Sequence, residues 1–184
     1  MEKKIKLPLT KELAQTLHAG DTVYVTGTIY TSRDAGHKRM CEALEKGETL
    51  PFDPVDATIY YVGPTPAKPG QVIGSAGPTT SGRMDAYAPT MMSVGARGMI
   101  GKGARLPEVI AAMKEHKGVY FGAIGGAGAL LAKCIKKAEL VAYEDLGAEA
   151  LRRLYVEDMP LVVIIDCEGR NLYEEGKAAY LASK

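Results

Sequence analysis

Two polar turns in the sequence combine hydroxyl side chains with arginine, a combination that can bind an anion. The first turn, Gly77–Asp85 (GPTTSGRMD), follows the apolar residues 72–74 and precedes an expected helix. A strand-to-helix turn directs free backbone N–H groups and the positive end of the helix dipole at its ligand. Arg83 adds a forked donor suited to a carboxylate or a phosphate. An isolated Thr-Thr-Ser is more typical of an ordinary helix cap, so a binding site requires further support.

The second turn, Thr31–Arg39 (TSRDAGHKR), also follows an expected strand and opens an expected helix. We expect Arg33 in the first helical turn, where a cation is unfavourable against the helix dipole. A residue placed against local preference often serves a site. His37 lies four residues after Arg33, so both share a helix face, and Asp34 is placed to hold either of them. Taken alone, His37 is more typical of a half-buried structural histidine.

A third cation, Lys102, lies between two glycines after a short expected strand. Flanking glycines let the backbone approach a ligand closely. Arg33, Arg83 and Lys102 would each lie beyond the end of a strand, and such ends gather at one binding edge in α/β sheets. Three cations beside the hydroxyl group of Thr79 would suit a small dianion such as a dicarboxylate.

Composition limits the class of protein. The chain has 184 residues, of which 46% are hydrophobic and 24% charged, and these values are typical of one globular domain over residues 1–184. The formal net charge of +1 argues against a general nucleic-acid partner. No apolar run is long enough to cross a membrane, and the first residues do not resemble a signal peptide. We therefore expect a cytoplasmic protein.

The three cysteines, Cys41, Cys134 and Cys167, are widely spaced and include no CxxC pair. A disulfide framework or a metal site within this chain is therefore not expected, and each thiol is typical of a small core residue. The sequence also shows no cysteine–histidine nucleophile and no paired carboxylates for glycosidase-like chemistry. The polar turns thus supply only part of an active site.

Hydrophobic patterning predicts an α/β layered domain with a mixed sheet. The opening segment 7–19 is expected to be a surface helix or turn. Strands are expected at 22–28, 57–62, 71–75, 97–100, 119–123, 140–142 and 161–165. Helices are expected at 34–44, from the Thr79 turn to about residue 94, at 107–114, from 128 to 137, at 148–154 and at 171–181.

The glycine-rich segment Gly122–Gly128 suggests a nucleotide-binding alternative. It lacks the third glycine of the dinucleotide-binding fingerprint, and no acidic residue is convincingly placed about 20 residues further on, since Glu144 is loosely spaced. Dinucleotide binding is therefore not favoured. A non-catalytic regulatory domain that binds an anion or a nucleotide stays open as an alternative.

Six ordered motifs closely resemble one family over nearly the whole chain, from Ile5 onward: SRDAGHKR, YVGPTP, GPTTSGRMD, GKG, AIGGAGAL and DCEGRNLY. The family is the β subunit of class I, iron–sulfur fumarate hydratase, which is equivalent to the C-terminal domain of the single-chain enzymes. The β subunit of L-tartrate dehydratase is similar and is kept as an alternative. This resemblance implies a swivelling β/β/α three-layer domain.

The resemblance also implies a reaction, the reversible hydration of fumarate to (S)-malate. A partner α subunit would carry a [4Fe–4S] cluster whose open iron acts as a Lewis acid, and this chain would contribute no ligand to the cluster. Thr79 matches the proposed base for the C3 proton of malate, and Arg33, Arg83 and Lys102 match residues that hold the C4 dicarboxylate. His37 is a candidate to bind or support the substrate by its place in the motif. The expected assembly is a hetero-oligomer with the α subunit, or a homodimer of the isolated chain.

Overall fold

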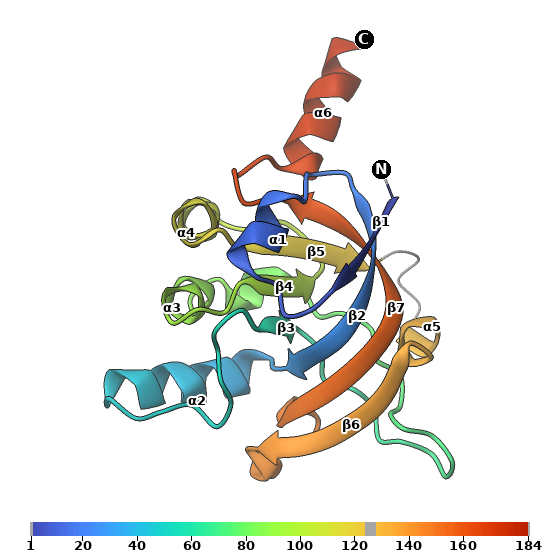
Figure 1. Ribbon diagram of the computed structural model, residues 1–184. Coiled ribbons are helices and arrows are strands. Elements are labelled where there is room, and N and C mark those ends of the chain that lie inside the picture. The colour runs from blue at the N-terminus through green and yellow to red at the C-terminus, as the bar shows by residue number, and fades with distance from the viewer. Residues whose placement is uncertain (1, 124–127, 184) are drawn as a thin grey trace.

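One mixed sheet organises the fold (Figure 1). The computed structural model describes residues 2–123 and 128–183. Within them the sheet has seven strands in the order β1-β2-β3-β4-β5-β7-β6. The strands are β1 (Glu2–Lys6), β2 (Thr22–Thr31), β3 (Thr58–Tyr60), β4 (Gly98–Gly101), β5 (Val119–Ala123), β6 (Ile135–Ala142) and β7 (Leu151–Ile165).

Helices connect and cover these strands. The α-helices are α1 (Lys11–Gln15), α2 (Asp34–Glu45), α3 (Ala88–Ser93), α4 (Pro107–His116), α5 (Gly128–Ala132) and α6 (Leu172–Ala182). Two 3₁₀ helices, η1 (Ser81–Met84) and η2 (Glu144–Glu149), lie in the connections. Figure 1 shows α2, α3 and α4 together beside the short strands, while α6 extends away from the sheet.

The sheet closes on itself because β7 is long enough to pair with three strands. Residues 161–165 of β7 pair with β5, residues 152–162 pair with β2 across a bulge, and residues 151–156 also pair with β6. The parallel pairs β2–β3, β3–β4 and β4–β5 complete a ring that returns to β7. The carboxyl ends of β2, β3, β4 and β5 therefore lie at one edge of the ring.

Side-chain alternation divides the core into two clusters, as period-two strands require. In β3, Tyr60 belongs to the cluster inside the ring, whereas Ile59 belongs to the cluster outside it. In β5, Phe121 points to the inner cluster and Tyr120 to the outer one. The inner cluster is closed by α1 and α5. The outer cluster packs the methionines of α2, α3 and α4 against the sheet, among them Met40, Met91, Met92 and Met113.

The predicted α/β class and mixed sheet are confirmed. The strand predicted at 119–123 appears with the predicted ends, and those at 140–142 and 161–165 lie within β6 and β7. The strands predicted at 22–28, 57–62 and 97–100 and the helices at 34–44, 107–114 and 171–181 appear with shifted ends. The expected helix from the Thr79 turn is divided into η1 and α3, and β1 was not predicted. No helix of the described residues has the length and hydropathy needed to cross a membrane. The swivelling three-layer arrangement stays a prediction.

Three predicted elements were wrong. Residues 71–75 form no strand. The segment that faces them, 64–69, has prolines without N–H donors, and in the described part of the chain its hydrogen bonds to 71–75 are confined to the pairs Thr65–Ser75 and Lys68–Gln71. The helix expected to continue to 137 ends at Ala132, and β6 follows. The helix expected at 148–154 is instead η2 and the start of β7. Its alanine, leucine and glutamate residues favour a helix locally, but pairing of β7 with both β2 and β6 overrides that preference.

Phe121 tests the inner cluster, since its side chain is 1% exposed inside the ring. Phe121→Ala removes the ring and leaves a cavity, so we expect a loss of about 3–5 kcal/mol in the free energy of unfolding. Urea denaturation followed by circular dichroism measures this loss. Leu140→Ala is the control, because Leu140 is 49% exposed. Equal losses in the two variants would contradict the assignment of Phe121 to a packed interior.

Candidate functional site

The carboxyl ends of two parallel strands place the first two cations of the site. β2 ends at Thr31, and Arg33 follows as the residue that caps α2, with an extended backbone (φ −122°, ψ −160°). The sequence predicted Arg33 in the first helical turn, but Arg33 precedes the helix. Asp34 begins α2, and its carboxylate suits the positive end of the helix dipole. β4 ends at Gly101, and the exposed side chain of Lys102 follows immediately.

Thr79 reaches the same edge, although no strand precedes it. Its N–H donates to the carbonyl oxygen of Tyr61 just beyond β3 (2.7 Å). Its carbonyl oxygen accepts from the N–H of Lys102 (3.3 Å), whose own carbonyl oxygen accepts from the N–H of Ser81 (2.8 Å). The polar turn thus runs between the extensions of β3 and β4, and its backbone holds Thr79 and Lys102 as neighbours.

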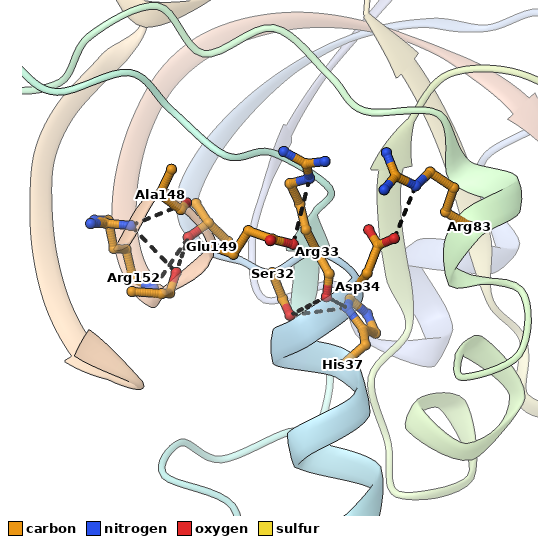
Figure 2. A network of polar contacts seen from close by, with 10 residues as sticks. Ser32, Arg33, Asp34, His37, Arg83, Ala148, Glu149 and Arg152 are labelled. Carbon is orange, nitrogen blue, oxygen red and sulfur yellow. Dashed lines mark hydrogen bonds and ion pairs between the residues drawn. The ribbon is translucent and has the colours of Figure 1, made fainter. Parts of the chain in front are cut away.

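Arg83, on η1, joins the site through Asp34. Its Nε donates to Oδ2 of Asp34 at 2.9 Å. Since Asp34 follows Arg33 in the chain, this ion pair brings both arginines to the same side of the molecule, and Figure 2 shows them flanking Asp34. The structure therefore gathers Arg33, Thr79, Arg83 and Lys102 at one edge of the sheet.

The side chain of Arg33 is more buried than that of Arg83. It is 25% exposed, against 55% for Arg83. Its Nε lies 3.8 Å from Oε1 of Glu149 at the end of η2, an ion pair without a hydrogen bond. A methyl group at Gly63 would lie 3.0 Å from Nη1 of Arg33, so the arginine packs closely over this glycine.

The hollow beside Lys102 is a cleft of about 450 Å³. Lys102, Pro78 and Tyr173 are among its lining residues, whereas Arg33 and Arg83 are not. Arg83 and Lys102 thus lie at an exposed surface, whereas Arg33 is half-buried. Another surface would have to exclude water from them during a reaction.

His37 lies behind the site and not in it. Its side chain is 1% exposed, and its Nδ1 lies 2.9 Å from Oγ of Ser32 and 3.0 Å from the carbonyl oxygen of Arg33. In the Nδ1–H tautomer the ring donates to that carbonyl oxygen and fixes the backbone of Arg33. Burial, with a smaller effect from Arg105, lowers the pKa of His37 to about 4, so the ring is neutral at physiological pH.

A buried ion pair supports the turns, and no sequence pattern pointed to its basic member, Arg105. Arg105 donates from Nε to Oδ1 of Asp85 (2.6 Å) and from Nη2 to the hydroxyl of Tyr61 (3.2 Å). The second oxygen of Asp85 accepts from the N–H of Leu106 (2.8 Å). The side chains of Arg105 and Asp85 are 0% and 2% exposed. Asp85 ends the GPTTSGRMD turn, so the pair anchors that turn to the segment after Lys102.

Tyr120 ties the same two segments together a second time. Its hydroxyl donates to the carbonyl oxygen of Gly103 (2.8 Å) and lies 2.7 Å from Oγ of Ser81. Burial raises the pKa of Tyr120, so the phenol stays protonated and can donate. A methyl group at Gly101 would lie only 2.0 Å from Oγ of Ser81, so the close approach of the turn to β4 requires a glycine.

The thiols of the chain do not assemble into a metal site. Cys41 and Cys167 are buried, Cys134 is half-buried, and burial raises the pKa of each. In the part of the chain that the structure describes, no three His, Cys, Asp or Glu side chains are placed to hold a metal ion. These residues do not fit a [4Fe–4S] cluster. The glycine-rich segment Gly122–Gly128 includes residues 124–127, which lie outside the described residues.

The depressed pKa of His37 makes stability depend on pH. In the unfolded chain the ring takes up a proton near pH 6.5, but in the folded chain only near pH 4. The stabilisation is therefore complete above about pH 6.5 and is lost as the pH falls to 4, by about 3 kcal/mol. Urea titrations across this range should show a smaller acid loss in His37→Asn than in the wild type. The exposed His18→Gln serves as the control, and an unchanged profile in His37→Asn would contradict burial of a neutral ring.

Loss of the buried Arg105–Asp85 pair should lower the free energy of unfolding far more than loss of the exposed Arg39–Asp145 pair. Asp85→Ala leaves a buried guanidinium without its counter-charge, and we expect a loss of about 3–5 kcal/mol in the free energy of unfolding. Asp145→Ala breaks the exposed Arg39–Asp145 pair and should leave that free energy nearly unchanged. Thermal and urea unfolding measure both losses. Similar values for the two variants would be inconsistent with a buried anchor.

The sequence is similar to known proteins over most of its length. A family model described as "Fumarase C-terminus" matches residues 1–176. The class I, aerobic fumarate hydratase of Salmonella typhimurium is 41% identical over 153 residues, which cover 82% of this chain and 26% of that protein. Fumarate hydratase 2 of Leishmania major is 38% identical over 175 residues, 93% of this chain and 31% of that protein. The chain thus spans less than a third of these fumarate hydratases.

A relative of similar length is found in Methanocaldococcus jannaschii. Its name assigns it provisionally as L(+)-tartrate dehydratase subunit beta, and it is 38% identical over 173 residues. The match covers 91% of this chain and 89% of that protein. The names of these relatives are those of hydro-lyases or their subunits. Because the family model covers nearly the whole chain, the chain belongs to the fumarase C-terminal family.

Proposed function

We propose that this chain is the β subunit of a hydro-lyase that interconverts (S)-malate and fumarate. The observation that carries the proposal is the convergence of Arg33, Thr79, Arg83 and Lys102 at the carboxyl ends of β2, β3 and β4. Two forked cations and one ammonium group match the two carboxylates of a C4 diacid. Family membership supports the same reaction class.

The chain's own residues would bind the substrate and help to move one proton. Removal of the C3 proton of malate builds negative charge on the adjacent carboxylate, and a preorganised cationic clamp stabilises that charge. Thr79 is the proposed base, beside Lys102. A threonine hydroxyl is a poor base in water, so this role requires a dry and cationic assembled site. His37 would act from behind by holding the backbone of Arg33.

A partner subunit is part of the proposal. The [4Fe–4S] cluster would be carried by an α subunit and supply Lewis acid chemistry there, because the described residues of this chain do not fit a cluster. The open position of the cations supports a site that a second surface completes. Assembly as a hetero-oligomer follows from this division of roles. The cytoplasmic location stays a prediction.

L-tartrate dehydration is the second candidate, because the methanogen relative provisionally named as an L(+)-tartrate dehydratase subunit beta is 38% identical to this chain over 173 residues. Malate and tartrate differ by one hydroxyl group at the carbon that loses its proton. Steady-state kinetics of the assembled enzyme on both substrates, side by side, decides between them.

Arg83→Ala tests the clamp. Removal of the Arg83 guanidinium should lower kcat/KM for malate about 10²–10³-fold, because a charge that stabilises the transition state is lost. The variant is co-expressed with the cluster-bearing α subunit under anaerobic conditions and assayed by the absorbance of fumarate. Arg39→Ala is the control, since Arg39 is bound to Asp145 and lies outside the clamp. Near-normal kcat/KM for Arg83→Ala, or full turnover by this chain alone without iron, would reject the proposed function.

A further inference from the structure

Both arginines of the clamp are held from the side by a carboxylate of this chain. Asp34 accepts from Nε of Arg83 at 2.9 Å, and Glu149 lies 3.8 Å from Nε of Arg33. Figure 2 shows each contact entering at the Nε edge of the guanidinium, with the two terminal nitrogens pointing away from the carboxylate. No hydrogen bond among the described residues uses the terminal nitrogens of Arg33 or Arg83. The side-on contact therefore leaves the forked end of each arginine available.

Arg39 shows the opposite arrangement on the same elements. It lies on α2 and donates from Nη1 and Nη2 to the two oxygens of Asp145 on η2, both at 2.8 Å. Both terminal nitrogens of Arg39 are bound to Asp145, so this arginine has no free forked end to offer to a substrate carboxylate. Two arginines thus lie where α2 meets η2. The terminal nitrogens of Arg39 are hydrogen-bonded to the protein, whereas the contact of Arg33 with Glu149 is at Nε.

The two carboxylates are themselves fixed in place. Asp34 is the first residue of α2, where the helix dipole stabilises its charge. Glu149 ends η2, and Arg152 holds that segment by donating to the carbonyl oxygens of Gly147, Ala148 and Ala150. Oδ1 of Asp34 and Oε1 of Glu149 are buried atoms without a hydrogen-bond partner in the described structure. A buried carboxylate oxygen without a hydrogen bond lowers the stability of the fold, so its presence calls for a compensating role.

Their charge alone would work against a dianionic substrate. Arg33, Arg83 and Lys102 bring three positive charges to the edge, and Asp34 and Glu149 bring two negative ones. Removing a nearby negative charge should strengthen the binding of a dicarboxylate by Coulomb attraction. Removing a residue that orients an arginine should weaken it. Charge and orientation thus predict opposite signs for the same substitution.

We propose that Asp34 and Glu149 are positioning residues that grip Arg83 and Arg33 at Nε and present both forked ends to the carboxylates of the substrate. The inference rests on the proposed dicarboxylate function and adds the residues that orient its clamp. Asp34 is the stronger of the two, since its contact is a true hydrogen bond. Neither residue touches the substrate in this scheme.

A graded series at residue 34 tests the proposal in the complex with the α subunit. Asp34→Asn keeps an acceptor for Nε and should raise KM for malate a few-fold, whereas Asp34→Ala frees the guanidinium and should lower kcat/KM about 10–100-fold. Both variants lose the same charge. A charge effect alone would give equal changes in the two variants and a KM below that of the wild type, and that outcome would overturn the proposal.

Two control variants separate positioning from folding and from the proposed function. Asp145→Asn removes an equivalent carboxylate between α2 and η2, and its kinetics should match the wild type. If Arg83→Ala has a strongly reduced kcat/KM while Asp34→Ala has that of the wild type, only the positioning role is rejected. If Arg83→Ala is itself normal, the clamp fails with it. Glu149→Gln and Glu149→Ala should repeat the graded order through Arg33, with smaller effects because that contact is longer.

Nitrogen-15 NMR of the full chain gives a readout that does not depend on turnover. In the wild type, the hydrogen bond to Asp34 should slow exchange of the Nε proton of Arg83 with water. Asp34→Ala should speed this exchange several-fold, with Asp34→Asn between the two, while the Nε signal of Arg39 stays unchanged. An Arg83 signal that is the same in all three proteins would overturn the proposal.

Discussion

The buried pair between Arg105 and Asp85 is the interaction on which the site depends. A guanidinium and a carboxylate that are almost fully removed from water are tolerated only when each is fully bonded, and Tyr61 and the N–H of Leu106 complete that bonding. The pair fixes the end of the polar turn against the segment that follows β4. Tyr120 adds a neutral tie between the same segments. The exposed cations above can therefore be long and flexible side chains while their backbones keep fixed positions.

Much of the fold followed from local pattern, and the failures have two physical origins, strand partners that are distant in the sequence and prolines that remove pairing donors. Asp34–Glu45 has helical spacing and Val119–Ala123 is an apolar run, so local preference and tertiary structure agree there. Leu151–Val156 has helix-forming residues, but its two neighbouring strands lie far away in the sequence. Residues 71–75 look like a strand yet face prolines. Pairing partners that are distant in the chain are what a single sequence does not display.

The candidate site was predictable to a different depth at different residues. Arg33, Thr79, Arg83 and Lys102 stand in polar turns between apolar segments, and parallel strands made their convergence foreseeable. Arg105 and Tyr120 carry no such signal, because an arginine or tyrosine in a sequence is ordinarily a surface or core residue. Glu149 was hidden for another reason: the expected helix at 148–154 gave it no relation to the site. The observed end of η2 places it beside Arg33.

The closure of the ring by β7 also bears on how the protein is made. β2 emerges from the ribosome early, but one of its three partner strands, β7, comes much later in the sequence. Until most of the polypeptide has been synthesised, β2 has an unpaired edge, and such edges associate with other chains. Contacts between segments so distant in the sequence also form slowly. Nascent chains of this protein are thus expected to need protection during translation until β7 covers that edge.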